Sequence, residues 1–174
     1  MVRTRLETEE QRTRRASWLA AALVLTAAGI ARAGDGDAVV GVWATNPDAE
    51  GGQAHIEIFK DNGTYGGRIV WLEKPEYPPD DDEGMAGQTK VDRRNPDPAL
   101  RDRPVLGLKM MRGFTYAGGN RWEKGTIYHP VDGKTYECEM TLDDDGTLKV
   151  RGFIAVSLLG RTEVWTPVEA DDES

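Results

Sequence analysis

The densest group of side chains that could bind or carry charge lies between residues 92 and 103. Within these twelve positions the chain places four arginines, three aspartates and one asparagine. A guanidinium group holds a carboxylate or phosphate through two parallel hydrogen bonds, so Arg101 and Arg103 are candidates for contacting an anionic group. Asp92 and Asn95 are further candidates for ligand binding. The alternative is that the acids cap turns and the arginines pair with acids inside the segment.

These residues belong to an unusually long stretch without a strand or helix pattern, residues 73–104, here called the long loop. It holds six of the nine prolines, whereas connections in compact domains are usually about 4–6 residues long. Proline lowers the entropy lost when a loop becomes ordered, and long ordered loops carry function disproportionately often. We therefore expect the long loop to cover one end of the domain.

The other polar residues form no recognisable catalytic or metal-binding pattern. His55 and His129 are the two histidines, too few for a zinc site unless carboxylates join them. The acidic run at 80–83 lacks the spacing of a twelve-residue calcium loop, which favours a solvated acidic loop. The chain contains no Gly-x-Ser-x-Gly and no His-Glu-x-x-His motif. We expect no metal, no cofactor and no enzymatic activity.

Cys138 is the single cysteine, so an internal disulfide is excluded. Apolar residues alternate with polar ones from Thr135 to Leu142, and this period of two places Cys138 on the apolar face of a strand. A reactive thiol needs exposure and positive neighbours. The pattern favours an inert, buried cysteine.

Three aromatic residues are candidates for stacking a flat ligand: Trp71, Trp122 and Tyr128. Trp71 and Trp122 lie near the ends of predicted strands, where the mouth of a barrel would be. The alternative is that all three are core or interface residues, which is the commoner role of large aromatics.

The elements that must position these groups are short β-strands separated by turn signals. Strand-like composition, turn residues such as Asn-Gly at 62–63, and the absence of a helical period predict an all-β domain. Eight such runs form a sandwich or a single antiparallel barrel, and closure removes the edges that invite aggregation. An eight-stranded barrel has room for a packed core or for one small ligand. The predicted strands are residues 39–45, 56–60, 64–72, 106–116, 122–128, 135–142, 148–156 and 162–166.

The N-terminus, residues 1–33, reads as a cleaved signal peptide. Arginines precede an uncharged stretch of 15 residues, and Ala31-Arg32-Ala33 carries small residues where a signal peptidase cuts. The stretch is short for a membrane span of about 20 residues. Arg14-Arg15 raises the twin-arginine export route, but Ser17 and Trp18 follow where an aromatic residue and a leucine are usual, which favours the general route. Residues 34–168 are then the barrel domain, and the acidic residues 169–174 are expected to be a disordered tail.

Charge excludes two classes of partner. The whole chain has a formal net charge of −8, and removing residues 1–33 makes it more acidic, because that segment carries six arginines and three glutamates. Nucleic acid phosphates and anionic lipid surfaces would repel such a domain. We expect no nucleic-acid binding and no stable membrane insertion after signal removal. The oligomeric state is left open.

The first strand and the last predicted strand resemble those of lipocalins. Gly41-Val42-Trp43 is similar to the Gly-x-Trp that opens the lipocalin barrel. The resemblance implies that Trp43 plugs one end of the barrel and that Arg161 packs over it as a cation–π contact.

A longer resemblance covers residues 40–168. The chain is similar to a bacterial secreted family catalogued as domain of unknown function 2147, with one departure: His129 stands where an aspartate is expected. The family resemblance implies a calycin-like, lipocalin-like barrel in the periplasm and supplies no established activity. The matching segments are Asn-Pro-Asp-Pro at 95–98, Leu-Arg-x-Arg-Pro at 100–104, Gly-Leu at 107–108, Ile-Tyr-x-Pro-x-Asp-Gly-Lys-x-Tyr at 127–136, Gly-x-Leu-x-Val-Arg-Gly at 146–152 and Leu-Gly-Arg-Thr at 159–162.

Together these observations predict a periplasmic or secreted barrel, from a Gram-negative bacterium, that binds one small, partly apolar ligand, with an acidic head as one option. The alternative is an envelope interaction module with a packed barrel, which contacts protein or cell-wall partners through the long loop. The two differ in interior volume: bulky inward residues that fill the barrel favour the interaction module, whereas a continuous apolar pocket of about 300 Å³ or more favours ligand binding.

Overall fold

The computed structural model describes residues 36–47, 52–153 and 160–169. The predicted signal peptide and its cleavage site, and nearly all of the predicted tail, lie outside the described residues. None of the helices in the described part is long and apolar enough to cross a membrane.

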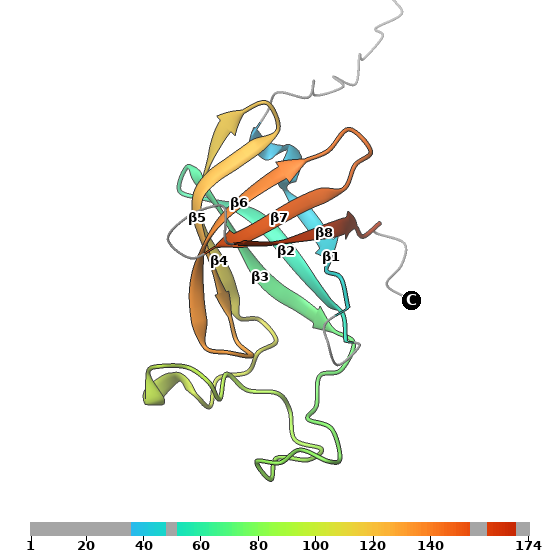
Figure 1. The fold of residues 1–174 in the computed structure, drawn as a ribbon, viewed down its shortest axis with the longest axis vertical. Helices are drawn as coiled ribbons and strands as arrows, with labels where there is room; N and C mark the ends of the chain where they lie inside the picture. Colours follow the sequence, from blue (N-terminus) through green and yellow to red (C-terminus); the bar gives the residue numbers. More distant parts are fainter. Residues whose placement is uncertain (1–35, 48–51, 154–159, 170–174) are drawn as a thin grey trace, which may run out of the picture. The chain divides into compact units, whose positions relative to one another are not determined.

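The described chain folds into a closed antiparallel barrel in which each strand pairs with the next and the eighth pairs with the first (Figure 1). The barrel closes through Trp43 opposite Pro167 and Ala44 opposite Thr166. The prediction of an all-β eight-stranded barrel is therefore confirmed, and the sandwich alternative is wrong. The strands are β1 (Gly41–Ala44), β2 (Ala54–Asp61), β3 (Thr64–Leu72), β4 (Lys109–Gly118), β5 (Arg121–His129), β6 (Lys134–Leu142), β7 (Leu148–Phe153) and β8 (Gly160–Pro167).

The turn chemistry explains most of the strand boundaries. Asn62 and Gly63 have φ angles of 50° and 86°, as a two-residue hairpin turn requires. Gly113, with φ of 75°, lies where β4 carries one residue more than β3, which makes it part of a β-bulge. Gly107 instead precedes β4, since the Leu108 N–H donates to Val105 O at 3.1 Å and forms a turn there. The fourth strand therefore starts three residues later than predicted.

Bulky side chains fill the barrel from every strand. Trp122 and Phe114 are fully buried, and Trp165 is 1% exposed. Phe114 lies against Gly125 so closely that a Cβ on this glycine would stand 2.4 Å from the ring. Cys138 is 2% exposed on the same inner face, and burial raises the pKa of its thiol to about 12. The prediction of a buried cysteine is confirmed.

One end of the barrel is closed by η1, a 3-10 turn over Gly36–Val39 that the sequence pattern did not predict. The Trp122 indole donates to Gly36 O at 3.0 Å, the Trp43 indole donates to Val39 O at 2.9 Å, and the Tyr65 hydroxyl donates to Asp37 at 2.6 Å. Trp122 is therefore a buried anchor at the η1 end. It does not lie at an open mouth, where the strand-end argument had placed it.

Arg161 does not pack over Trp43. It lies at the start of β8, opposite Gly152, whereas Trp43 pairs with Pro167 at the end of β8. Arg161 and Pro167 are six residues apart on the extended strand, which places Arg161 about 20 Å along β8 from the partner of Trp43. The Arg161 side chain is 78% exposed and its Nε lies 3.5 Å from a carboxylate oxygen of Glu163. The barrel-closing pair inferred from the lipocalin resemblance is absent.

The long loop lies at the other end of the barrel, below β3 and the β5–β6 hairpin in Figure 1. It leaves β3 after Leu72 and contains η2, a 3-10 turn over Pro98–Leu100 that Asp97 caps. Two isolated bridges, Glu76 with Thr89 and Val91 with Pro104, fold the loop back on itself. The loop is thus an ordered structure, as its length and proline content indicated.

Candidate functional site

Three of the predicted site residues converge on the buried carboxylate of a fourth, and we call the four the Asp92 cluster: Asp92, Asn95, Arg103 and Tyr128. Asp92 is completely buried. One of its oxygens accepts from the Tyr128 hydroxyl at 2.5 Å, and the other accepts from Asn95 Nδ2 at 2.7 Å and from Arg103 Nε and Nη2 at 2.9 and 2.7 Å. The loop and β5 therefore meet at a single charged group.

The backbone around the Asp92 cluster positions it. The Asp92 N–H donates to Arg103 O, and the Asn95 N–H donates to Asp92 O, both at 2.9 Å. Gly133, in the hairpin after β5, approaches Arg94 O so closely that a Cβ would stand 1.9 Å from that oxygen. Only glycine fits there, because the hairpin and the loop are in direct contact.

The electrostatics make Tyr128 a hydrogen-bond donor. Burial raises its pKa to about 12, and the hydrogen bond to Asp92 acts in the same direction. The phenol therefore keeps its proton at neutral pH. Because the carboxylate, the amide, the guanidinium and the phenol satisfy one another, the cluster acts first as a clamp that joins the long loop to β5. Its role in binding a ligand stays a prediction.

The other three candidates lie elsewhere, and one of them, Trp122, is buried at the η1 end. Arg101 donates from Nε to Asn95 O at 2.8 Å and its side chain is exposed. Trp71 is 41% exposed and stacks on His55 with ring centroids 4.3 Å apart. The residues predicted as one binding set are therefore divided among the clamp, the exposed Arg101, the Trp71–His55 pair and the buried Trp122.

A second buried acid in the long loop was missed by the sequence argument. Asp81 belongs to the acidic run expected to be solvated, yet its side chain is 3% exposed and accepts from Arg93 Nη1 at 2.8 Å. Arg93 in turn lies 4.2 Å from the centroid of the Tyr77 ring. Hydrogen bonds from the backbone, chiefly the Met85 N–H, lower the pKa of Asp81. The loop thus carries a small core of its own.

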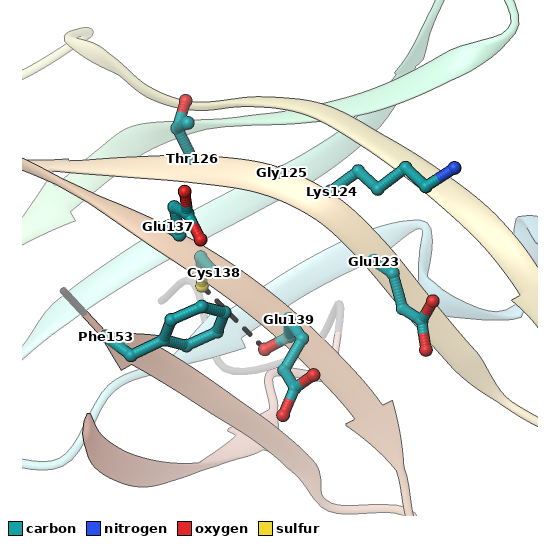
Figure 2. Close-up of a pocket in the computed structure, with 8 residues that line it drawn as sticks. All are labelled: Glu123, Lys124, Gly125, Thr126, Glu137, Cys138, Glu139 and Phe153. Carbon is teal, nitrogen blue, oxygen red and sulfur yellow. Dashed lines mark hydrogen bonds between the residues drawn. The ribbon is translucent and has the colours of Figure 1, made fainter. Parts of the chain in front are cut away.

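A pocket with a volume of about 530 Å³ opens on the wall of the barrel, and we call it the wall pocket (Figure 2). The buried positions Gly125 and Cys138 lie beneath it, while Thr126, Glu137 and Phe153 share the outer face through the cross-strand pairs Thr126–Glu137 and Glu137–Phe153. Its lining comes from β5, β6 and the end of β7: Glu123, Lys124, Gly125, Thr126, Glu137, Cys138, Glu139 and Phe153.

A bulge in β5 shapes the wall pocket. Between Trp122 and Gly125 this strand carries one residue more than β6, and Lys124 has a φ of 62°. Such a bulge bends the strand and redirects its side chains. The sequence gives little indication of this bulge, because a positive φ angle usually occurs at glycine or asparagine and here occurs at a lysine. Among the described residues, no group of three or more His, Cys, Asp or Glu side chains is arranged to hold a metal ion.

The comparisons with known proteins agree with this architecture. Residues 41–167 match the family described as "Uncharacterized protein conserved in bacteria (DUF2147)". The barrel is similar in structure to protein HP1028 from the human pathogen Helicobacter pylori, which is described as a lipocalin. The two chains are 22% identical with a TM-score of 0.63, over 76% of this chain and 84% of the other. No curated protein matches the chain. The chain therefore belongs to the DUF2147 family of bacterial proteins and has a lipocalin-like barrel.

Proposed function

We propose that this chain is an exported, non-enzymatic binding protein of the bacterial envelope, which takes one small, partly apolar ligand in the wall pocket. The observation that carries the proposal is the pocket itself. Its volume of about 530 Å³ falls within the range of about 300–1,000 Å³ that is usual for small-molecule sites, but its lining is mostly polar and is not the apolar pocket that the sequence criterion named.

By the criterion of interior volume, the filled interior favours the packed-barrel alternative, so a bound ligand needs a site away from the barrel axis. An eight-stranded barrel holds either packed side chains or a small ligand, and here Trp122, Trp165 and Phe114 are buried inside it. At Gly125 the inner side is occupied by the Phe114 ring, so the wall pocket is not continuous with the axis at that point. Its polar rim and the Phe153 ring suit a ligand with both polar and apolar parts.

Export and domain limits form part of the proposal. Residues 1–33 carry the features of a signal peptide, residues 34–168 contain the barrel, and residues 169–174 are a short acidic tail. A Gram-negative periplasm is the compartment that fits this arrangement. Expression of the full chain in such a host, followed by fractionation and N-terminal sequencing, tests it, and recovery of the uncut chain from the cytoplasm would contradict it.

Native mass spectrometry of the exported protein tests ligand binding. Thr126→Trp places a large ring in the wall pocket. Thr135→Trp is the control, because Thr135 is an exposed residue of β6 that does not line the pocket. We expect a stoichiometric extra mass in the wild type and in Thr135→Trp, and its loss in Thr126→Trp. Phe153→Ala is a second pocket variant that adds no bulk. Equal occupancy in all four proteins would contradict the proposal.

A second function, an envelope interaction module, is favoured by the rigid long loop. Two buried acids, each bonded to an arginine of the loop, hold it in one shape, and Leu100 in η2 is 39% exposed. In that case the loop surface contacts a protein or cell-wall partner. Cross-linking in the periplasm compares the wild type with Leu100→Asp, and an unchanged set of cross-linked partners would exclude this surface.

A further inference from the structure

The wall pocket carries ionic side chains of both signs that have no ionic partner in the described structure. Glu137 and Glu139 project from the same face of β6, two residues apart. Neither makes an ion pair with a described residue, and Glu139 lies opposite Arg151 of β7, whose guanidinium donates to Thr162 Oγ1 at 2.9 Å. Glu123 differs, since its carboxylate accepts from Arg121 Nη2 at 2.5 Å. Two carboxylates are therefore available on the β6 side of the pocket.

Lys124 supplies the positive charge of the wall pocket, at the opposite end of its lining from Phe153 (Figure 2). Lys124 projects from the β5 bulge, is exposed, and also lacks an ion pair with the residues that the structure describes. In Figure 2 the Lys124 side chain extends away from Glu137 and Phe153, with Glu139 and Glu123 between the two ends. The pocket thus has a basic end and an acidic side next to an aromatic ring.

We infer that the ligand of the wall pocket is a small zwitterion with an apolar side group, of the size and kind of a short peptide. Its ammonium group lies near Glu137 and Glu139, its carboxylate lies near Lys124, and the apolar group contacts Phe153. This inference rests on the proposed function, because it names the ligand class of that same pocket.

Opposite charge at both ends favours a zwitterion over the competing ligand classes. A purely anionic ligand would place its charge beside Glu137 and Glu139, and a purely cationic one would leave Lys124 unused. Because the pocket is partly open to solvent, each ionic contact resembles an exposed pair, and such pairs are weak. Loss of one contact should therefore weaken binding by about fivefold at most.

Four probes separate the contributions: the dipeptide Leu-Phe, its N-acetyl form, its C-terminal amide, and the doubly blocked form. Isothermal titration calorimetry with the exported protein measures the dissociation constant of each. We expect Leu-Phe to bind tightest, each singly blocked form to bind about three- to fivefold more weakly, and the doubly blocked form to bind weakest.

Two pocket variants assign each contact to a residue. Glu137→Gln with Glu139→Gln should weaken Leu-Phe and its amide but leave the N-acetyl form unchanged. Lys124→Met should weaken Leu-Phe and the N-acetyl form but leave the amide unchanged. Asp144→Asn and Lys134→Met change the same kinds of charge outside the lining and serve as controls that should bind like the wild type.

The possible failures are distinguishable. Equal binding of all four probes, abolished by Thr126→Trp, would overturn the zwitterion and leave small-ligand binding in place. Absence of binding by every probe at millimolar concentration would also overturn it, and the native mass spectrum would then decide the proposed function separately. Binding that Thr126→Trp leaves unchanged would remove the wall pocket as the site, and both proposals with it.

Discussion

Replacing Asp92 by asparagine tests the clamp between the long loop and β5. The substitution keeps the shape of the side chain and removes its charge. One acceptor oxygen becomes an amide donor, so either the Tyr128 hydroxyl or the donors from Arg103 and Asn95 lose their acceptor. Arg103 also loses its counter-charge. The donors cannot turn to water easily, because Asp92 is completely buried.

The expected cost follows from the geometry. Breaking a buried ion pair by removing one partner costs about 3–5 kcal/mol, but the Arg103 side chain is 32% exposed, and solvent screening reduces that value. We expect a loss of about 3 kcal/mol in the free energy of unfolding, and for a domain of this size a fall in Tm of roughly 10 °C.

Thermal unfolding followed by circular dichroism measures the loss, and hydrogen exchange locates it. Exchange should accelerate at the Asp92 and Asn95 amides, which donate within the loop, before it accelerates in the barrel strands. Asp102→Asn, an exposed carboxylate ten residues away, is the matched control and should melt like the wild type. If Asp92→Asn melts and exchanges like Asp102→Asn, the cluster does not hold the loop.

Four further outcomes follow from the described contacts. Cys138 should resist thiol reagents at pH 8–9 until the protein unfolds, because burial raises its pKa to about 12; rapid labelling of the folded protein would contradict its position. Gly125→Ala should destabilise the barrel by about 1–3 kcal/mol in a urea titration, since the added Cβ would meet the Phe114 ring. Trp122→Phe should cost about 1 kcal/mol by the same method through loss of the hydrogen bond to Gly36 O. The raised pKa of Tyr128 means that the folded state holds the phenol proton more tightly than the unfolded state does. The stability that this proton contributes is present below pH 10 and is lost as pH rises toward 12. A plot of unfolding free energy against pH should show this loss for the wild type and not for Tyr128→Phe.

Strand composition and turn residues were enough to predict eight β-strands, because these signals are local, whereas closure into a barrel was inferred from the cost of open edges and from the family resemblance. Asn62-Gly63 specifies a hairpin by its own backbone preferences, and alternation around Cys138 shows which face is buried. The η1 turn was not predictable in this way. Gly36–Val39 is held by the Trp122 and Trp43 indoles, and one of these donors is 86 residues distant in the sequence.

The candidate site was harder to predict because it depends on contacts across the fold. Asp92, Asn95 and Arg103 were selected as a group from their crowding in the sequence, and they do meet, yet they bind one another and Tyr128. Composition alone cannot distinguish a self-satisfied cluster from a ligand site. The expected contact of Arg161 with Trp43 failed for a similar reason, since it depends on how β8 is shifted against β1.

The wall pocket had no sequence signal of its own. It arises because one extra residue in β5, at Lys124, faces Glu139 on β6, and because Gly125 lacks a side chain between Phe114 and the outer surface. A bulge of this kind is a property of the strand pair, so neither strand reveals it by itself.

A crystal structure of the exported protein, purified without refolding from a Gram-negative periplasm, tests the central claim most directly. We expect electron density for a small molecule in the wall pocket, between Lys124 and Phe153, and no such density among the core side chains around Trp122. Density along the barrel axis, or a ligand held by Arg101 and the long loop with the wall pocket empty, would contradict it.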